Sequence, residues 1–476
     1  MANAAVKAML ASPRAFAIAA AGCGKTELLG QIVADQRSGR QLILTHTHAG
    51  VAAIKKRLAD LRVPRERFHL DTIAGWCLRY GAAYPTMSGF RAGAEADPDW
   101  DASYPGAEKV CSSTLGKRVI RESYDGALID EYQDCSVRQH AVVRALSACI
   151  PCRGVGDPLQ TVFGFRNDPI VPWTTIRTDF EVLDDALKEP WRWRRPGRNA
   201  ALGEWLVEAR GQLESSKRLV IADDAPVTWI QHPGNGETAE AWAEACKDAG
   251  DPDDTVVAIL KWPNSSKNLA RRLAGRWPIV ERFDDPDLLR VGVRLADGDG
   301  PSAADTLVEF VADRMTLMGT ELRPMVEAIK AGRGTSRFSK NREHADRLDT
   351  LAKDPTPANA LAWLDGVLAH KNDWWLYRRE CVFQLRAALR ECAGTSMAAL
   401  PDAVAAARTR ARHRGRQTHR RTIGTPLLVK GLEFDHAVLL WEPDHLSVEG
   451  LYVALTRASK SLTVVSCSRT LLPEGT

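Results

Sequence analysis

The sequence predicts an α/β fold in which parallel sheets carry helices on their faces. From residue 15 to residue 157, short apolar runs alternate with stretches of helical periodicity, a pattern typical of such sheets. A glycine-rich loop, Gly22-Cys-Gly-Lys-Thr26, stands between the first apolar run and the first expected helix. With 476 residues the chain is too long for one hydrophobic core, so we expect two or three domains.

The elements of the first half are expected in a regular order. The apolar runs that predict strands are residues 15–20, 42–45, 127–129 and 154–156. The stretches that predict helices are residues 27–35, 49–58 and 136–147. Residues 84–106 interrupt the alternation with Gly, Pro and Asp, which indicates a small inserted subdomain or loop.

A second α/β pattern begins near Trp191. Its expected strands are residues 255–260, 422–427, 437–441 and 461–465. The segment between them, residues 301–414, is rich in Ala, Leu, Arg and Glu at helical spacing. We therefore expect a helical insertion within the second domain.

Composition excludes several classes of protein. No apolar stretch approaches the roughly 20 residues that span a bilayer, so we expect no membrane association. The apolar residues near the N-terminus precede the glycine-rich loop and are expected to form a buried strand rather than a signal peptide. The 10 cysteines lie in a chain without secretory features, which predicts reduced thiols and a cytoplasmic protein. The net charge of +4 is too small to indicate a nucleic-acid partner by itself.

A second motif supplies carboxylates that a nucleotide site needs in addition to the glycine-rich loop. It is the run Ala-Leu-Ile-Asp-Glu-Tyr-Gln-Asp at residues 127–134. It ends an apolar strand in two adjacent carboxylates, Asp130 and Glu131. A bound nucleoside triphosphate with Mg²⁺ needs amides and a lysine at the phosphates, a hydroxyl and an aspartate at the metal, and a base for water. The two motifs together predict hydrolysis of ATP, with ATP and Mg²⁺ bound.

The expected role of each residue in the two motifs follows from this chemistry. We expect phosphate contacts from Ala21, Gly22, Cys23, Gly24 and Lys25, Mg²⁺ ligation by Thr26 and Asp130, and general-base catalysis by Glu131. Two interpretations of the Cys23 thiol stay open. It is either a small side chain that fits the loop, or a reactive thiol whose pKa is lowered by the lysine and the helix N-terminus.

Further segments resemble those of superfamily 1 helicases of the UvrD/Rep type. Ala19 stands where most phosphate loops have their first glycine, as in this family, whose loop is AxxGxGKT. Residues 156–166, GDPLQTVFGFR, are similar to the family's GDxxQxIYxFRG, and residues 42–58 and 71–76 to its DNA-contacting segments. Pro-Trp-Arg at residues 190–192 stands where the family has Asn-Tyr-Arg. Residues 429–434 and 451–458 match the family's AKGLEF and YVAxTRA.

This resemblance implies two RecA-like P-loop domains with parallel sheets, plus small inserted helical subdomains. Residues 1–190 would form the first domain with an insertion near residues 81–116. Residues 191–290 would begin the second domain, residues 291–415 would be a mainly helical insertion, and residues 416–476 would complete the second domain. Arginines from the second domain would reach the nucleotide only when the domains close, and closure would change the grip on DNA.

The resemblance also implies functions for individual residues. At the nucleotide it implies γ-phosphate sensing by Gln160, base stacking by Trp191, phosphate contact by Arg192, an arginine finger at Arg457, and ribose-side contacts at Gly431 and Glu433. At single-stranded DNA it implies contacts by Thr47, His48, Thr72, Trp76, Phe163, Phe165 and Arg166. Alternatives stay open: the arginines could be paired on the surface, and Trp76 and the phenylalanines could belong to the core.

Two departures from the family pattern limit the resemblance. Residues 1–18 contain no Gln, whereas most relatives carry an upstream glutamine that recognises adenine, so base specificity stays open. The family's Thr-Leu-His-Ser is Thr-Pro-Leu-Leu here, at residues 425–428. Residues 408–421 hold seven arginines and two histidines, which could bind phosphates, contact an acidic partner or form a solvated hinge.

These observations predict a compact UvrD-like motor that couples ATP hydrolysis to movement on single-stranded or partly duplex DNA, 3′ to 5′ by resemblance. The alternative is a DNA- or nucleotide-sensing subunit that regulates a partner nuclease in a hetero-oligomer, as the resemblance to the helicase-like subunit of the Gabija anti-phage system implies. A structural ATPase without activity is disfavoured because the expected catalytic residues are present.

Overall fold

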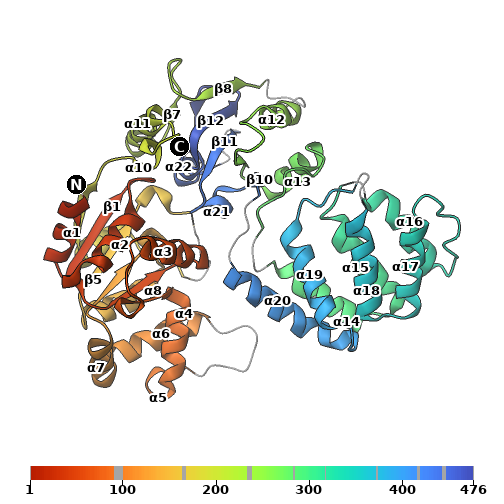
Figure 1. Cartoon of the computed structure of the whole chain (residues 1–476), viewed down its shortest axis with the longest axis horizontal. Helices are drawn as coiled ribbons and strands as arrows, with labels where there is room; N and C mark the ends of the chain where they lie inside the picture. The colour runs from red at the N-terminus through yellow and green to blue at the C-terminus, as the bar shows by residue number, and fades with distance from the viewer. Residues whose placement is uncertain are drawn as a thin grey trace. The chain divides into compact units, whose positions relative to one another are not determined.

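The computed structural model describes residues 2–90, 100–162, 168–232, 238–281, 285–316, 318–370, 374–414, 419–441 and 446–474. The chain divides into two compact units, residues 1–231 with 430–476 and residues 232–429 (Figure 1). Residues 191–231 and 430–476 thus group with the N-terminal part of the chain. The four-part domain scheme drawn from the resemblance stays a prediction.

The first unit contains a six-stranded parallel sheet in the order β3-β2-β4-β5-β1-β6. The strands are β1 (Arg14–Ala19), β2 (Gln41–Thr45), β3 (Phe68–Thr72), β4 (Gly126–Ile129), β5 (Cys152–Gly156) and β6 (Glu181–Leu187). Since all neighbours are parallel, the carboxyl ends of the strands lie along one edge, where the loops that follow them meet.

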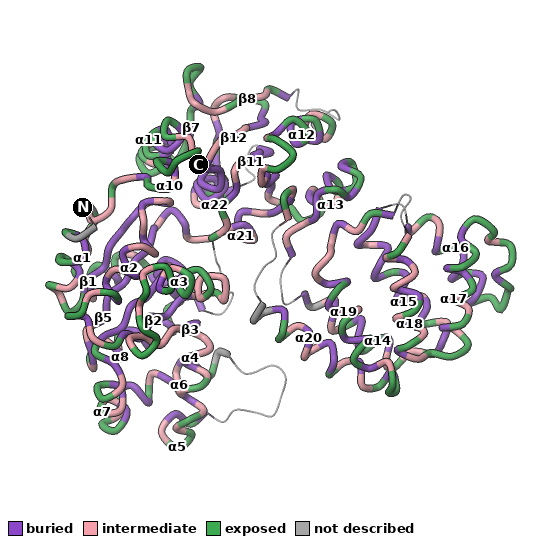
Figure 2. Tube along the Cα trace, in the orientation of Figure 1, coloured by how far each residue is buried: buried purple, intermediate pink, exposed green. Residues whose placement is uncertain are grey.

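Helices cover both faces of this sheet. They are α1 (Ala2–Ala11), α2 (Lys25–Ala34), α3 (His48–Asp60), α4 (Ile73–Ala83), α5 (Pro85–Ser88), α6 (Trp100–Ser112), α7 (Thr114–Ser123), α8 (Val137–Ser147) and α9 (Trp173–Asp179). In β1, Ala15 and Ala17 pack into the core beneath α1, α2 and α3, while Phe16 and Ile18 pack into the core of the other face. This period of two buries the strand on both sides, and Figure 2 shows the central strands of the sheet mostly as buried trace.

The C-terminal segment adds a second parallel layer to the first unit. Strand β11 (Phe434–Leu440) pairs with β12 (Ala458–Ser466), which pairs with β8 (Thr228–Gln231). Strands β7 (Leu219–Val220) and β13 (Thr470–Leu471) form an antiparallel pair. The helices of this part are α10 (Trp191–Arg194), α11 (Ala200–Ser216) and α22 (Val448–Leu455).

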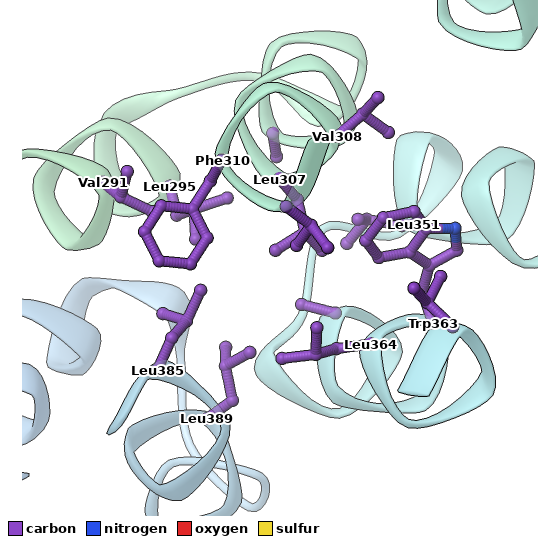
Figure 3. Packing of buried hydrophobic residues seen from close by; sticks show 14 of the residues in the cluster. Val291, Leu295, Leu307, Val308, Phe310, Leu351, Trp363, Leu364, Leu385 and Leu389 are labelled. Atoms are coloured by element: carbon purple, nitrogen blue, oxygen red, sulfur yellow. The ribbon is translucent and has the colours of Figure 1, made fainter. Parts of the chain in front are cut away.

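The second unit combines a parallel strand pair with a helical part. Strands β9 (Val256–Ile259) and β10 (Arg421–Gly424) pair in parallel beside α12 (Thr238–Lys247), α13 (Pro263–Arg272) and α21 (Pro426–Val429). The helical part comprises α14 (Pro286–Asp297), α15 (Gly300–Ala312), α16 (Met318–Lys330), α17 (Arg342–Lys353), α18 (Pro357–Ala369), α19 (Arg379–Glu391) and α20 (Leu400–Arg414). Figure 3 shows Phe310, Leu307, Leu364, Leu385 and Leu389 meeting in its core.

The predicted fold class, α/β with parallel sheets and an added helical part, is confirmed, and the arrangement is consistent with two RecA-like domains. Within the described residues, no helix combines the length and the apolar character needed to cross a bilayer.

Candidate nucleotide and metal site

The glycine-rich loop connects the end of β1 to the start of α2. Gly22 and Gly24 adopt φ values of 71° and 91°, in the left-handed region that side chains rarely occupy. A Cβ atom at Gly22 would lie 2.4 Å from Cζ3 of Trp193, and the N–H of Arg192 donates to the Gly22 carbonyl over 3.1 Å. The loop is therefore closely packed against α10, and glycine is required where that helix approaches.

Lys25 and Thr26 stand at the N-terminus of α2, where free backbone amides and the helix dipole favour an anion. The Lys25 ammonium is buried and donates to the carbonyl oxygens of Ala19 and Ala20 over 2.9 and 3.3 Å. Cys23 is also buried, and burial raises the pKa of its thiol despite Lys25 nearby. The structure thus favours the interpretation of Cys23 as a small side chain that fits the loop.

The two adjacent carboxylates follow β4 and have opposite pKa shifts. Burial and the neighbouring Glu131 raise the pKa of Asp130 to about 7. Burial also acts to raise the pKa of Glu131, but Lys430, Lys25 and a hydrogen bond from Gln133 outweigh it and hold that pKa below its ordinary value. Glu131 has a left-handed φ of 53°, and strain at a non-glycine residue is a common feature of functional sites.

The oxygen donors present fit a magnesium ion. Asp130 offers a buried carboxylate and Thr26 a hydroxyl at the start of α2, and Lys25 lies near enough to Asp130 to lower its pKa. Magnesium prefers hard oxygen ligands and takes few of them from protein. A bound Mg²⁺ would also stabilise the ionised form of Asp130.

A buried hydrogen-bond chain connects Glu131 to Gln160. The Gln133 side chain donates to Glu131 and accepts from the Asp157 N–H over 2.9 Å. The Asp157 carboxylate accepts from Nε2 of Gln160 over 2.7 Å. Gln160 ends a short 3₁₀ turn after β5, so the segments after two neighbouring strands hold each other.

Lys430 fixes the same region from the C-terminal segment. Its ammonium lies 2.5 Å from Oδ2 of Asp134 and donates to the Gln160 carbonyl oxygen over 2.5 Å. Burial raises the pKa of Asp134 to about 7, although the Lys430 charge opposes that shift. The predicted γ-phosphate sensor is therefore held at both its side chain and its backbone.

Both predicted phosphate-contacting arginines lie in the first unit with the glycine-rich loop. Arg192 donates to the Thr456 carbonyl over 2.7 Å and pairs with Glu433 at 3.1 Å. Arg457 is 1% exposed and donates to the carbonyls of Val453 and Leu432 and to the Thr456 hydroxyl.

Arg457 is electrostatically close to Arg192 and to the general-base candidate Glu131. Burial and the neighbouring Arg192 lower the pKa of Arg457 to about 9, while Glu131 opposes the shift. Burial likewise lowers the pKa of Arg192, and Glu433 opposes it. Both guanidinium groups are thus largely desolvated, which differs from a pair of exposed surface arginines.

A small pocket adjoins the glycine-rich loop on the β6 side. Trp191 is 49% exposed and lines this pocket with Cys23, Gly24, Glu27, Leu28 and residues 186–189. A Cβ atom at Gly24 would lie 3.7 Å from Cδ1 of Trp191. The indole thus stands beside the loop that would hold the phosphates. Gly431 is exposed, with a φ of 78°.

The predicted DNA-binding residues fall into two described groups. Thr47 caps α3 by accepting from the Gly50 N–H, His48 begins that helix, and Thr72 caps α4. Thr47 and His48 follow β2 and Thr72 ends β3, so the three lie along the same sheet edge as the glycine-rich loop. Trp76 is 1% exposed and stacks on Tyr80 with ring centroids 4.4 Å apart, so it takes the core role left open for it.

The remaining predicted DNA-binding residues, Phe163, Phe165 and Arg166, lie outside the described residues. Sequence reasoning also missed participants in the site. Lys430, Asp134 and Tyr452 lie inside the segments that resemble the helicase family, so inspection of those segments could have identified them. Arg210, which pairs with Asp157 at 2.7 Å, lies in no such segment and had no sequence signal.

Comparison with known proteins gives one family match. Residues 111–181 match the model of the UvrD/REP helicase N-terminal domain. This segment includes Asp130, Glu131 and Gln160, so the match covers the carboxylates after β4 and the predicted γ-phosphate sensor. No curated protein matches the sequence significantly.

Two solved viral helicases are also similar to the chain. The PRRSV helicase has 12% identity and a TM-score of 0.35, with 98% of this chain and 54% of that chain covered. The arterivirus nonstructural protein 10 helicase in complex with DNA has 12% identity and a TM-score of 0.34, with 97% and 63% covered. The chain thus spans between half and two thirds of the length of these two helicases.

Proposed function

We propose that this protein is a superfamily 1 motor that couples ATP hydrolysis to binding and movement of single-stranded DNA. The observation that carries the proposal is that Arg192 and Arg457 are desolvated and lie in one unit with the Lys25 loop, with Arg457 close enough to Glu131 for their charges to interact. Hydrolysis of a phosphoanhydride develops charge on the transferred phosphoryl oxygens, and guanidinium groups stabilise that charge.

Each residue contributes a defined step to hydrolysis. The amides of the loop and the Lys25 ammonium bind the phosphates, while Thr26 and Asp130 hold Mg²⁺, which neutralises phosphate charge when bound. Glu131, ionised because its pKa is held low, accepts the proton of the attacking water. Gln160 contacts the γ-phosphate from the adjoining segment, and Trp191 stacks on the base.

The proposed DNA contacts use the same sheet edge. Thr47 and Thr72 lie at the N-termini of α3 and α4, where hydroxyls and free amides suit a phosphate backbone. These caps and the nucleotide loop lie at the carboxyl ends of β-strands of one parallel sheet. A conformational change at the nucleotide can therefore alter the contacts with the bound DNA. Movement in the 3′ to 5′ direction is proposed from the family resemblance alone.

The proposal is tested by measuring steady-state ATP hydrolysis with and without an unstructured single-stranded oligonucleotide at low salt. We expect stimulation by the oligonucleotide, and weaker stimulation as salt rises, because phosphate contacts release counterions. Lys25→Ala serves as the inactive control. Hydrolysis that no single-stranded DNA stimulates at low salt would contradict the motor function.

A second candidate is a DNA- or nucleotide-sensing subunit that licenses a partner nuclease in cytoplasmic anti-phage defence. The observation that favours it is the helical part, which has a core of its own and exposes Val293 and Phe383 on α14 and α19. Stoichiometric recovery of a nuclease from the native host would support this candidate, and robust unwinding by the isolated chain would count against it.

A further inference from the structure

Arg210 on α11 occupies an unusual position for a residue outside the helicase-like segments. Its guanidinium lies 2.7 Å from Oδ1 of Asp157, and the two side chains are 13% and 0% exposed. A second ion pair joins it to Glu214, one helical turn further along α11, at 2.9 Å. Complete burial of a carboxylate costs free energy unless the group is paired and hydrogen-bonded, so the ion pair with Arg210 offsets the cost of burying Asp157.

On one side, Arg210 reaches the catalytic segment through Asp157. The Asp157 oxygen that Arg210 does not contact accepts from Nε2 of Gln160 over 2.7 Å. The backbone N–H of Asp157 donates to Gln133, whose side chain donates to Glu131. Both the predicted γ-phosphate sensor and the predicted general base are therefore held through groups fixed by Asp157.

On the other side, Arg210 reaches the glycine-rich loop through Tyr452. The guanidinium donates to the Tyr452 hydroxyl over 3.3 Å and lies 5.3 Å from the centre of its ring. The same hydroxyl accepts from the Ala21 N–H over 3.2 Å. Tyr452 is buried on α22, in the segment of residues 451–458 that also contains Arg457. The contacts of Arg210 thus join α11, α22, the glycine-rich loop and the turn after β5.

We propose that Arg210 is a positioning residue that fixes Gln160 through Asp157 and the glycine-rich loop through Tyr452. This inference rests on the proposed ATPase function. Arg210 acts through its neighbours and not on the nucleotide, so its loss lowers kcat while the KM for ATP changes little. Misplacing a reacting group by about 1 Å lowers a rate by up to roughly 100-fold, whereas a purely structural ion pair affects mainly stability.

The test compares Arg210→Met with Arg67→Met. Arg67 is a matched control because its guanidinium also donates to three protein oxygens, those of Val33, Asp35 and Ser38, away from this chain of contacts. At a temperature where thermal unfolding shows all variants folded, Arg210→Met should lower kcat about 10- to 100-fold with KM within about threefold of the parent. Arg67→Met should keep the parental kcat.

Two further variants separate positioning from stability. Arg210→Met combined with Asp157→Asn removes the uncompensated charge, so stability should recover while kcat stays low. Arg210→Lys keeps the charge and should restore part of kcat. Recovery of kcat in parallel with stability in the double variant, or equal kcat for Arg210→Met and Arg67→Met, would overturn the role of Arg210. A parent chain that hydrolyses no ATP would instead overturn the proposed function, and this inference with it.

Discussion

The Lys25 ammonium lies 2.9 Å from the carbonyl oxygen of Ala19, at the start of the same loop. The lysine is thus held over the loop by hydrogen bonds to Ala19 and Ala20. Because an ammonium group has three donors, it can turn toward a phosphate while keeping part of this arrangement. The loop thus holds the ammonium beside its own backbone, as the proposed phosphate-binding role requires.

Lys25→Ala should weaken nucleotide binding. A charge-assisted hydrogen bond contributes about 1.5–3 kcal/mol, so we expect the Kd for ATP to rise at least about tenfold. Fluorescent-nucleotide titration measures this change, and thermal unfolding checks that the variant is folded. Unchanged affinity would contradict the assignment of this loop to the phosphates.

Asp130→Asn should stabilise the protein above neutral pH in the absence of Mg²⁺. The Asp130 carboxyl ionises near pH 3.8 in the unfolded chain but near pH 7 in the folded protein. Between these values the folded state binds the extra proton, so stability falls as pH rises. Asparagine cannot ionise, so the free energy of unfolding of the variant should exceed that of the parent by about 1 kcal/mol or more at pH 8. This difference should vanish by about pH 4.

Chemical denaturation at pH 4, 6 and 8 measures the pH dependence predicted for Asp130→Asn. Asp224→Asn, at an exposed carboxylate of the same unit, serves as the control and should show no such trend. The same Asp130 variant should lose Mg²⁺-dependent hydrolysis. A gain in stability that is independent of pH would show that the buried charge is not the cause.

Trp191→Ala should raise the KM for ATP while Trp191→Phe changes it little, because stacking needs an aromatic face. Stacking of a base on an aromatic side chain contributes about 1–3 kcal/mol, which corresponds to roughly a 5- to 150-fold change. Because residues 1–18 contain no glutamine, we expect the parent to accept GTP as well. Strict selection of ATP, kept in Trp191→Ala, would show that another group recognises the base.

Arg457→Gln should lower kcat about 1,000-fold or more and leave nucleotide affinity nearly unchanged, because an arginine finger acts in the transition state. Glutamine can still donate to the neighbouring carbonyls, which limits the loss of stability. Equilibrium nucleotide binding and single-turnover hydrolysis separate the two effects. A change confined to affinity would assign Arg457 to ground-state binding instead.

The sequence predicted those parts of the site that depend on local pattern. The glycine-rich loop, the carboxylates after β4 and the alternation of strands and helices over residues 15–157 follow from short segments, whereas the order of the strands within the sheet was not predicted. Trp76 could not be assigned from sequence, because its burial depends on how α4 packs in the tertiary fold. The same holds for the Cys23 thiol, whose raised pKa comes from burial.

Arg210 shows the limit of sequence reasoning most directly. It lies 53 positions from Asp157 and 242 from Tyr452, and only the tertiary fold brings these side chains together. A helical arginine on a half-buried face has no spacing that distinguishes it from a solvated one. Identifying long-range polar contacts of this kind therefore requires the folded structure.

The hydrolysis rate of Glu131→Gln, compared with that of the parent, tests directly whether Glu131 is the general base of an ATPase site. Each rate is measured with saturating ATP, Mg²⁺ and single-stranded DNA. Loss of a positioned general base should reduce kcat at least about 100-fold while nucleotide binding persists. Turnover of ATP by Glu131→Gln at the parental rate would contradict the site and the function built on it.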